Sequence, residues 1–338
     1  MRSEPSVSII VPTLNEEKYI RQAIGSLIPV EGLDYELIVL DGGSTDRTAS
    51  IVEELASSNA SIRLERNPAR YQSAAVNLGA KVAKPQSAII VRADSHAEYP
   101  PGFVAGLVGE LNQQKVASVV VPMRTRGKGF LQRGIAAAQN SRLGNGGAAH
   151  RTATSSRYVD HGHHAAFDRS AFLAVGGYDE SFTHNEDAEL DLRLRRSGAR
   201  IWLCSELAIS YFPRNSFGAL ARQYFNHGSG RAKTMLKHRR PPKLRQILPV
   251  GALGLNALSL ASGIVVSPLF LLPGLAYVGA CMTGGLFLAV SERDPAGCVA
   301  GPAAMIMHHS WAAGFIYRVL RSTASKAWPA PASIEAVR

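Results

Sequence analysis

Two potential metal ligands follow a short apolar run near residue 90. Residues 88–91 are apolar and rich in β-branched side chains, which is typical of a buried parallel strand, and Asp94 and His96 come directly after it. A carboxylate and an imidazole separated by one residue can face the same divalent ion, and open α/β sheets bind ligands at this end of their strands. Taken alone, the pattern more often marks an ordinary exposed turn, so a metal role depends on the neighbouring motifs.

A second carboxylate, Asp41, ends the apolar run 36–40 and precedes Gly42 and Gly43. About thirty residues separate it from the first apolar run, a position that suits hydrogen bonds from a ribose or a base. The alternative is that Asp41 only caps the glycine turn, and spacing alone favours neither. The first strand lacks a following G-x-G-x-x-G, which disfavours dinucleotide binding, and the absence of G-x-x-x-x-G-K-[ST] excludes a P-loop.

An acidic pair, Glu186 and Asp187, heads a predicted helix that also carries Leu190 and Leu194. Repulsion between neighbouring carboxylates can raise the pKa of one of them toward that of a general base. The alternative, which the residues alone favour, is that both merely interact with the helix dipole.

Histidines gather at His161, His163 and His164, but no cysteine or carboxylate completes a familiar zinc spacing. A structural or substrate-contact role is therefore preferred for them. Tyr178 and Trp202 can stack on a sugar ring, although aromatic residues beside strands usually belong to the core.

Strands and helices alternate from the first residues. Apolar runs predict strands at 7–11, 36–40, 61–65, 88–91 and 116–121, and helical spacing predicts helices ending near residues 27, 55 and 83. This alternation predicts an α/β protein with a doubly wound, mostly parallel sheet and right-handed crossovers. Residues 124–150, rich in Gly, Ala and Asn, are interpreted either as a mobile acceptor-binding segment or as a helix with flexible ends.

Several segments in order resemble the inverting family 2 glycosyltransferases, which have the GT-A fold. They are SIIVPTLNEE at 8–17, DGGSTD at 41–46, ADSH at 93–96, GGYDE at 176–180 and NEDAELDLRLRRSG at 185–198. More narrowly, the Asp-x-His form, RQYF at 222–225 and the apolar tail resemble glucosyltransferases of succinoglycan-type bacterial exopolysaccharide assembly. The resemblance implies that residues 1–230 form a GT-A domain, which is a Rossmann-like nucleotide-diphospho-sugar transferase fold.

On the donor side, the resemblance implies a nucleotide-sugar pocket lined by Pro12, Thr13, Glu16, Asp41 and Asp94. Asp41 would hold the uracil or ribose, while Asp94 and His96 would ligate Mn²⁺ or Mg²⁺ on the donor diphosphate. The family usually has Asp-x-Asp, and imidazole is a better ligand for Mn²⁺ than for Mg²⁺, so His96 favours Mn²⁺. On the acceptor side, Asp187 would deprotonate the acceptor hydroxyl, with Glu186, Tyr178, Arg193 and Gln223 around it.

An apolar C-terminal part follows a basic segment. The sequence predicts an interfacial helix at 214–226 and a basic juxtamembrane linker at 231–246. The alternative for residues 231–246 is an ordinary solvated linker. Residues 247–320 are interpreted as a membrane region, since 247–266 and 269–290 can each cross a hydrocarbon core of about 30 Å. A third apolar segment, 296–317, contains His308 and His309. A third crossing would place the tail 321–338 and the preceding Arg318 outside, against the positive-inside rule, whereas a re-entrant or interfacial segment would not.

The net charge and the cysteine content limit the classes of partner and the compartment that we expect. The formal net charge of +11 fits anionic lipid or phosphate-bearing substrates, and no nucleic-acid-binding signature is evident. Three cysteines argue against a disulfide framework and for a reducing compartment. We therefore expect membrane lipid, and no nucleic acid, among the partners.

These observations predict an inverting glycosyltransferase of the bacterial inner membrane with a cytoplasmic catalytic domain. It is expected to move one hexose, glucose from UDP-glucose, onto a lipid-linked (polyprenyl diphosphate) oligosaccharide in exopolysaccharide biosynthesis, forming a β-linkage. Processive relatives carry Q-x-x-R-W, and residues 223–227 lack its Arg-Trp, which favours single-sugar addition.

Two alternatives are weighed against this prediction. A nucleotidyltransferase usually has a basic Gly-rich loop after the first strand, which residues 13–17 lack. A non-catalytic membrane scaffold for other polysaccharide-assembly enzymes would tolerate degraded motifs, yet Asp41, Asp94 and Asp187 are all present.

Overall fold

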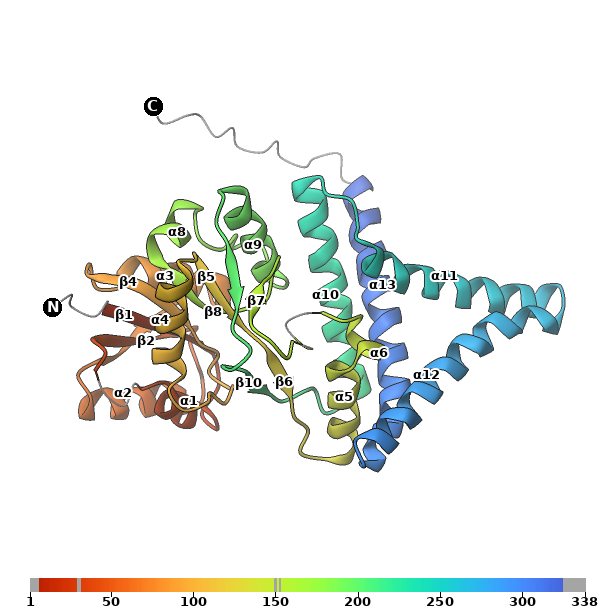
Figure 1. The fold of residues 1–338 in the computed structure, drawn as a ribbon, viewed down its shortest axis with the longest axis horizontal. Coiled ribbons are helices and arrows are strands. Elements are labelled where there is room, and N and C mark those ends of the chain that lie inside the picture. The colour runs from red at the N-terminus through yellow and green to blue at the C-terminus, as the bar shows by residue number, and fades with distance from the viewer. Residues whose placement is uncertain (1–5, 29–31, 149–150, 152, 325–338) are drawn as a thin grey trace.

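The computed structural model describes residues 6–28, 32–148, 151 and 153–324, and shows an α/β body from which a helical hairpin projects (Figure 1). The elements of the body are β1 (Ser6–Thr13), α1 (Ile20–Leu27), β2 (Tyr35–Asp41), α2 (Thr48–Ser58), β3 (Ile62–Arg66), α3 (Gln72–Val82), β4 (Ser87–Arg92), α4 (Phe103–Gln114), β5 (Ser118–Val121), β6 (Met123–Thr125), α5 (Phe130–Asn140), α6 (Arg142–Asn145), β7 (Arg157–Tyr158), β8 (His163–Asp168), α8 (Arg169–Ala174), α9 (Glu186–Arg196), β9 (Ile201–Leu203) and β10 (Ile209–Tyr211). The C-terminal helices are α10 (Phe217–His238), α11 (Leu244–Val265), η1 (Pro268–Leu271), α12 (Leu272–Ser291), η2 (Pro295–Val299) and α13 (Ala300–Ala324).

The main sheet has eight strands in the order β3-β2-β1-β4-β8-β5-β9-β7. The pairs β1–β2, β1–β4, β2–β3 and β5–β9 are parallel, whereas β8 is antiparallel to β4 and β5, and β7 is antiparallel to β9. The predicted α/β class with a mostly parallel sheet is confirmed. Because β1, β2 and β4 are parallel, the residues after Thr13, Asp41 and Arg92 meet at one edge of the sheet.

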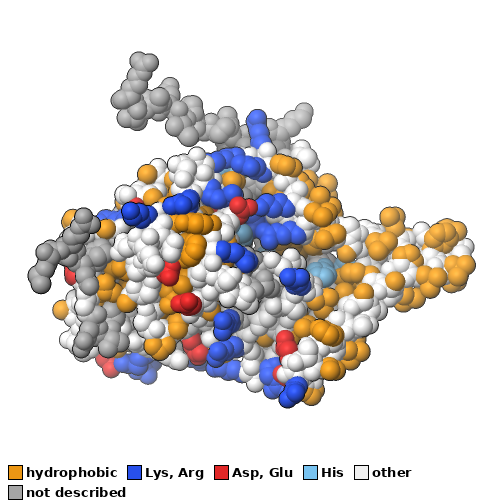
Figure 2. All heavy atoms as spheres, in the orientation of Figure 1, with side chains coloured by type: hydrophobic (Ala, Val, Ile, Leu, Met, Phe, Trp, Pro, Cys, Tyr) orange, Lys and Arg blue, Asp and Glu red, His pale blue; other side chains and the backbone are white. Residues whose placement is uncertain are grey.

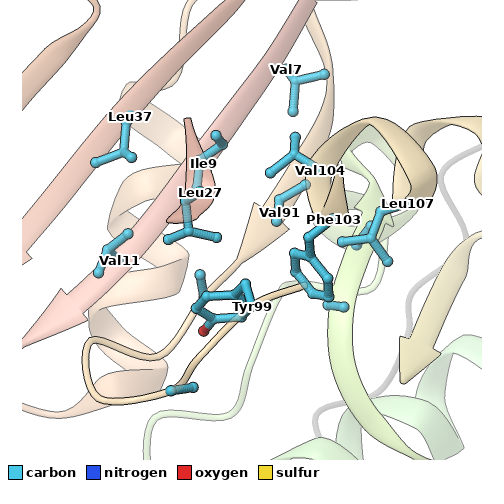
Figure 3. Packing of buried hydrophobic residues seen from close by; sticks show 14 of the residues in the cluster. Val7, Ile9, Val11, Leu27, Leu37, Val91, Tyr99, Phe103, Val104 and Leu107 are labelled. Carbon is cyan, nitrogen blue, oxygen red and sulfur yellow. The ribbon is translucent and has the colours of Figure 1, made fainter. Parts of the chain in front are cut away.

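The central strand β1 is buried on both faces, which explains its unbroken apolar sequence. Val7, Ile9 and Val11 pack in one cluster with α1 and α4, while the intervening Ile10 packs in another with α3. Figure 3 shows the first cluster, in which Leu27 of α1 and Phe103 of α4 face the strand. These two apolar layers hold the strand ends that carry the polar motifs.

Residues 124–150, for which the sequence left two interpretations, contain the end of β6 and the helices α5 and α6 where they are described. Ile135 and Ala138 of α5 are buried against α13. The segment therefore joins the sheet to the C-terminal helices.

Helix α10 is longer than the predicted interfacial helix of 214–226. It continues to His238, so residues 231–238 of the predicted linker belong to its last turns, and only 239–243 separate it from α11. The continuation is stabilised by contacts of α10 with α9 and α13. Helices α10 and α13 lie side by side in Figure 1.

Glycines allow α10 and α13 to approach closely. A Cβ atom on Gly228 would lie 1.9 Å from the Trp311 carbonyl oxygen, and one on Gly314 would lie 1.9 Å from the Phe225 carbonyl oxygen. The third apolar segment of the sequence thus packs along α10 as α13. Part of the predicted tail, 325–338, lies outside the described residues.

Among the described residues, two helical segments are long and apolar enough to cross a membrane, Leu244–Val265 and Pro268–Ser291. They form the hairpin that projects from the body in Figure 1, and hydrophobic side chains cover much of its visible face in Figure 2. Its returning end is tied to the body, because Arg133 Nε of α5 lies 2.9 Å from Asp294 Oδ2.

Candidate functional site

A cavity of about 930 Å³ lies at the sheet edge where β1 and β4 end, and it extends to the C-terminal helices. The residues of the donor-side and acceptor-side motifs that line it are Pro12, Thr13, Glu16, Asp94, His96, Glu186, Asp187 and Gln223. The cavity therefore brings together residues from distant parts of the sequence, such as Pro12, Asp94 and Asp187.

A buried arginine joins the two motifs. Arg92, the last residue of β4, is 5% exposed, and its Nη1 donates to Asp187 Oδ1 and, over 3.1 Å, to the Tyr178 hydroxyl. Its Nη2 lies 3.5 Å from Asp94 Oδ1. Burial opposes the charge of Arg92, but Asp187 beside it raises the pKa of the guanidinium well above its usual range. Arg92 thus remains a cation between the carboxylates of Asp94 and Asp187.

Asp94 is held as a carboxylate in this setting. Gln72 Nε2 donates to its Oδ1 over 2.7 Å, and burial, which raises its pKa, is outweighed by Arg92 and His163, which lower it. His163 itself lies between the two acids, with Nε2 3.6 Å from Asp94 Oδ2 and Nδ1 3.8 Å from Asp187 Oδ2. One of the clustered histidines is therefore at the centre of the site.

The residues fit a divalent ion bound together with a diphosphate. His96 also lines the cavity, and its Nδ1 lies 3.0 Å from Glu16 Oε1, the carboxylate–imidazole pairing found behind metal-binding histidines. Among the described residues no three His, Cys, Asp or Glu side chains gather as a metal cage. Divalent ions bound to substrate phosphates commonly use only one or two protein ligands, which Asp94 and His96 can supply.

Helix α9 begins with the acidic pair at the cavity wall. Its first turn also holds Glu189, and the macrodipole at this end favours negative charge. Burial, followed by the charge of Asp187, raises the pKa of Glu186 to about 7. The pair therefore differs in setting, because Arg92 and Tyr178 bind Asp187, whereas Glu186 takes the raised pKa.

Three predicted site residues lie outside the described cavity lining. Asp41 accepts hydrogen bonds from the backbone N–H of Gly43 over 3.0 Å and from Ser44, which is the turn-capping alternative. Arg193 pairs with Glu189 and donates to the Val175 carbonyl, so its guanidinium is used within the fold. The Tyr178 ring packs against Phe172 in the core, and only its hydroxyl reaches Asp187, over 2.9 Å.

The remaining aromatic and histidine predictions are placed as follows. Trp202 contacts Tyr158 edge-on within the body, away from the cavity lining. His161 lines the cavity, with Nδ1 3.7 Å from Asp191 Oδ2, while the side chain of His164 lies outside the described residues. Gln223 lines the cavity, and its Nε2 donates to the Tyr211 hydroxyl over 3.0 Å.

Comparisons with known proteins identify relatives of this chain. The family model Glycosyl transferase family 2 matches residues 8–176. The chain is 42% identical over 308 residues to the succinoglycan biosynthesis protein ExoA of Rhizobium meliloti (strain 1021), covering 91% of this chain and 93% of the relative. It is 23% identical over 322 residues to a dolichyl N-acetyl-alpha-D-glucosaminyl phosphate diacetamidodideoxyglucuronosyltransferase of Methanococcus voltae, covering 90% and 93% of the two chains.

One solved structure has a similar fold over most of the chain. It is the mannosyltransferase PcManGT from Pyrobaculum calidifontis in complex with GDP-Man and Mn²⁺, with a TM-score of 0.58 and 18% identity. The match covers 93% of this chain and 87% of that one.

Proposed function

The chain belongs to glycosyltransferase family 2 and is a glycosyltransferase of the GT-A fold, and from this membership we propose that it transfers one hexose from UDP-glucose to a lipid-linked oligosaccharide in the assembly of a succinoglycan-type polysaccharide. Similarity to the Rhizobium meliloti protein supports a role in the assembly of such a polysaccharide, because the two sequences align over nearly their whole lengths. The new linkage is β, since the reaction inverts the donor configuration.

The observation that carries the proposal is the bridge made by Arg92. This single buried guanidinium contacts Asp94 and Asp187, which come from segments with different expected roles. The donor diphosphate and the acceptor hydroxyl must lie close together in a direct displacement, and the bridge places the two carboxylates accordingly.

On the donor side, Pro12, Thr13 and Glu16 form the wall proposed for the nucleotide. Asp41 lies at the same edge of the sheet and is proposed to meet the uracil or ribose. Asp94 and His96 would hold Mn²⁺ or Mg²⁺, and a divalent ion bound there neutralises charge on the departing diphosphate.

On the acceptor side, Asp187 accepts the proton of the attacking hydroxyl. The hydroxyl oxygen forms a bond to the anomeric carbon on the face opposite UDP while the bond from that carbon to the diphosphate breaks. Arg92 and the Tyr178 hydroxyl fix the orientation of the Asp187 carboxylate before the acceptor arrives. Glu186 and Gln223 are proposed as acceptor contacts, because both line the cavity.

We propose that α11 and α12 cross the bacterial plasma membrane as a hairpin, with the body on the cytoplasmic side. Two features support this: the length and apolar surface of the hairpin, and the Lys and Arg side chains that gather beside its base in Figure 2. With α13 packed along α10, Arg318 stays on the same side as the basic residues of α10. This arrangement satisfies the positive-inside rule, which a third crossing would not.

The decisive experiment measures UDP release and sugar transfer by membranes containing the full chain, with UDP-glucose, Mn²⁺ and a lipid extract carrying the acceptor. Asp94→Ala and Asp187→Asn are the test variants, and Asp34→Asn, whose side chain is 56% exposed, is the matched control. We expect Asp187→Asn to lower transfer at least about a hundredfold, since the base is lost, and to leave UDP binding measurable as a thermal shift.

The variants separate the parts of the proposal. Full transfer by Asp187→Asn would remove the base assignment, and metal-independent transfer unaffected by Asp94→Ala would remove the metal assignment. If folded wild-type protein released no UDP from any of several UDP-sugars in the presence of that extract, the proposed reaction itself would be wrong.

A further inference from the structure

The cavity that holds Asp94 and Asp187 is lined by different charges in its different parts. Its described carboxylates are Glu16, Asp94, Glu186 and Asp187, which belong to the catalytic motifs. Five arginines that those motifs leave out also line it: Arg142, Arg151, Arg214, Arg231 and Arg245. They come from α6 and the segment after it, from the connection to α10, and from α10 and α11.

The two half-buried arginines of this set, Arg151 and Arg231, have neutral partners. Arg151 donates to Thr125 Oγ1 over 2.6 Å and lies over the Tyr211 ring, and Arg231 lies 3.4 Å from His161 Nε2. Throughout the part of the chain that the structure describes, none of the five guanidinium groups has a carboxylate oxygen within 4.0 Å. Arg142, Arg214 and Arg245 are exposed, whereas Arg151 and Arg231 are half-buried. Burial of a cation normally requires an opposite charge, so an anionic ligand would complete the surroundings of these two half-buried arginines.

The electrostatic effect of the arginines is visible in their neighbours. Burial and then the charge of Arg245 lower the pKa of Arg231 to about 10, and the nearby carboxylate of Asp191 opposes this shift without cancelling it. Burial and then the charge of Arg151 lower the pKa of His227 on α10 to about 3, with further contributions from Arg231 and Arg214. The positive groups therefore act on one region rather than on separate surface points.

Helix α11 connects this region to the apolar hairpin. Arg245, Leu248, Pro249 and Ala252 all line the cavity, and their spacing of three, four and seven residues places them on one face of the helix. The face thus changes from cationic to apolar within the first turns of a candidate membrane span. Apolar atoms of Met307 and Trp311 on α13 continue the lining.

We propose that the cationic region binds the diphosphate of the lipid-linked acceptor, with Arg231 and Arg245 as its principal ligands and the lipid lying along the apolar face of α11. The inference rests on the proposed function and assigns a second phosphate site, separate from the donor diphosphate near Asp94. Guanidinium groups match phosphate oxygens with paired hydrogen bonds, and a diphosphate supplies the missing negative charge. Along α11, the cationic Arg245 is followed by apolar side chains, in the same order as the diphosphate head group and the hydrocarbon of such a lipid.

The test is direct binding of a polyprenyl diphosphate without sugar to the full chain in phosphatidylcholine nanodiscs. Arg231→Gln and Arg245→Gln should each weaken binding about tenfold or more, the loss expected for one charge-assisted contact. Arg222→Gln is the matched control, because Arg222 is an exposed arginine of the same helix as Arg231 and is outside the cavity lining. Arg245 is exposed, so its variant should fold even if Arg231→Gln does not.

Further arms identify the ligand. Polyprenyl monophosphate should bind more weakly than the diphosphate, and phosphatidylglycerol should not compete at equal mole fraction. Equal binding by the wild type and both variants, or equal competition by phosphatidylglycerol, would overturn the assignment. Sugar transfer is measured on the same samples: binding that depends on both arginines, with no transfer from any UDP-sugar, would retain the diphosphate site and reject the proposed reaction.

Discussion

Arg92 connects the two halves of the proposed reaction, although its sequence context is that of an ordinary strand end. It follows Ile90 and Val91 and is buried, and a buried arginine is rare unless it is paired. That rule is the signal by which the sequence could have indicated an ion pair at Arg92. The partner could not be inferred, because Asp187 lies 95 positions further along the chain.

The other residues of the candidate site could be predicted from the sequence to different degrees. Asp94, His96 and Asp187 were predicted from motifs, and all three line the cavity. The central position of His163 was missed, because local spacing gives no information on which of several clustered histidines faces the carboxylates. Gln72 was missed because only the packing of α3 against β1, the neighbour of β4 in the sheet, brings its amide to Asp94.

The raised pKa of Glu186 gives a stability prediction. Between the ordinary carboxyl pKa of 4.5 and about 7, the folded chain keeps a proton that the unfolded chain has released. Glu186 therefore destabilises the fold increasingly as pH rises through this window, and the effect levels off above it. We expect the free energy of unfolding of Glu186→Gln, relative to that of wild type, to rise by about 2 kcal/mol between pH 5 and pH 8. This corresponds to about 3 °C in the thermal midpoint measured in detergent.

Stability must be measured at both pH 5 and pH 8. Only a pH-dependent change in the stability difference between Glu186→Gln and wild type reports the titration of Glu186. Asp34→Asn serves as the control and should show no such change. A constant difference between Glu186→Gln and wild type from pH 5 to pH 8 would show that Glu186 has an ordinary pKa.

Helices α9 and α10 are joined by a buried charge cluster. Glu189 of α9 is fully buried and lies 2.6 Å from Lys237 Nζ and 2.8 Å from His238 Nε2, both on α10, in addition to its pair with Arg193. Although burial opposes its charge, hydrogen bonds from His238 and Arg193 hold the pKa of Glu189 well below its usual range. The cluster fixes the helix that carries Asp187 to the helix that carries Arg231.

We expect Glu189→Gln to destabilise the protein by about 3 kcal/mol near neutral pH, because it removes the buried carboxylate that Arg193, Lys237 and His238 share. The stabilisation from Glu189 is present above its unfolded pKa and is lost as pH falls toward its folded value, so the deficit of the variant should shrink below about pH 4. Thermal midpoints measured across this range check both statements.

Asp160→Asn provides the contrast. Asp160 pairs with Arg195 of α9 and with Lys243 just before α11, but its side chain is 57% exposed, so we expect a loss of about 1 kcal/mol or less. Similar losses in both variants would contradict the importance assigned to burial.

Most elements of the body could be predicted from the sequence, because their apolar periods reflect burial on a sheet. The strands at 7–11, 36–40 and 88–91 correspond to β1, β2 and β4. The length of α10 and the docking of α13 could not be predicted, since they depend on contacts between segments about ninety residues apart, such as that of Gly228 with Trp311. The apolar run at 296–317 resembles a membrane span in the sequence, but α13 is not among the described helices that are apolar enough to cross a membrane.

In the whole molecule, the cavity is shared between the catalytic body and the base of the hairpin. Asp94 and Asp187 line it from the sheet side, and Arg245 and Leu248 line it from α11. The ion pair of Arg133 with Asp294 anchors the other end of the hairpin to α5. The proposed catalytic site and the proposed membrane hairpin thus belong to one structural unit.

A cavity that reaches the first turns of the proposed membrane hairpin has a kinetic consequence. The proposed lipid-linked acceptor would arrive by lateral diffusion, so the enzyme would respond to its number per unit area and not to its amount per millilitre. Diluting the acceptor tenfold with phosphatidylcholine at constant total amount should lower the initial rate about tenfold at low occupancy, whereas UDP-glucose should obey its bulk concentration. An initial rate that ignored the mole fraction of acceptor would show access from water. If the proposed attachment holds, a cell would regulate this step by the composition and area of its membrane, with no change in the total quantity of either substrate.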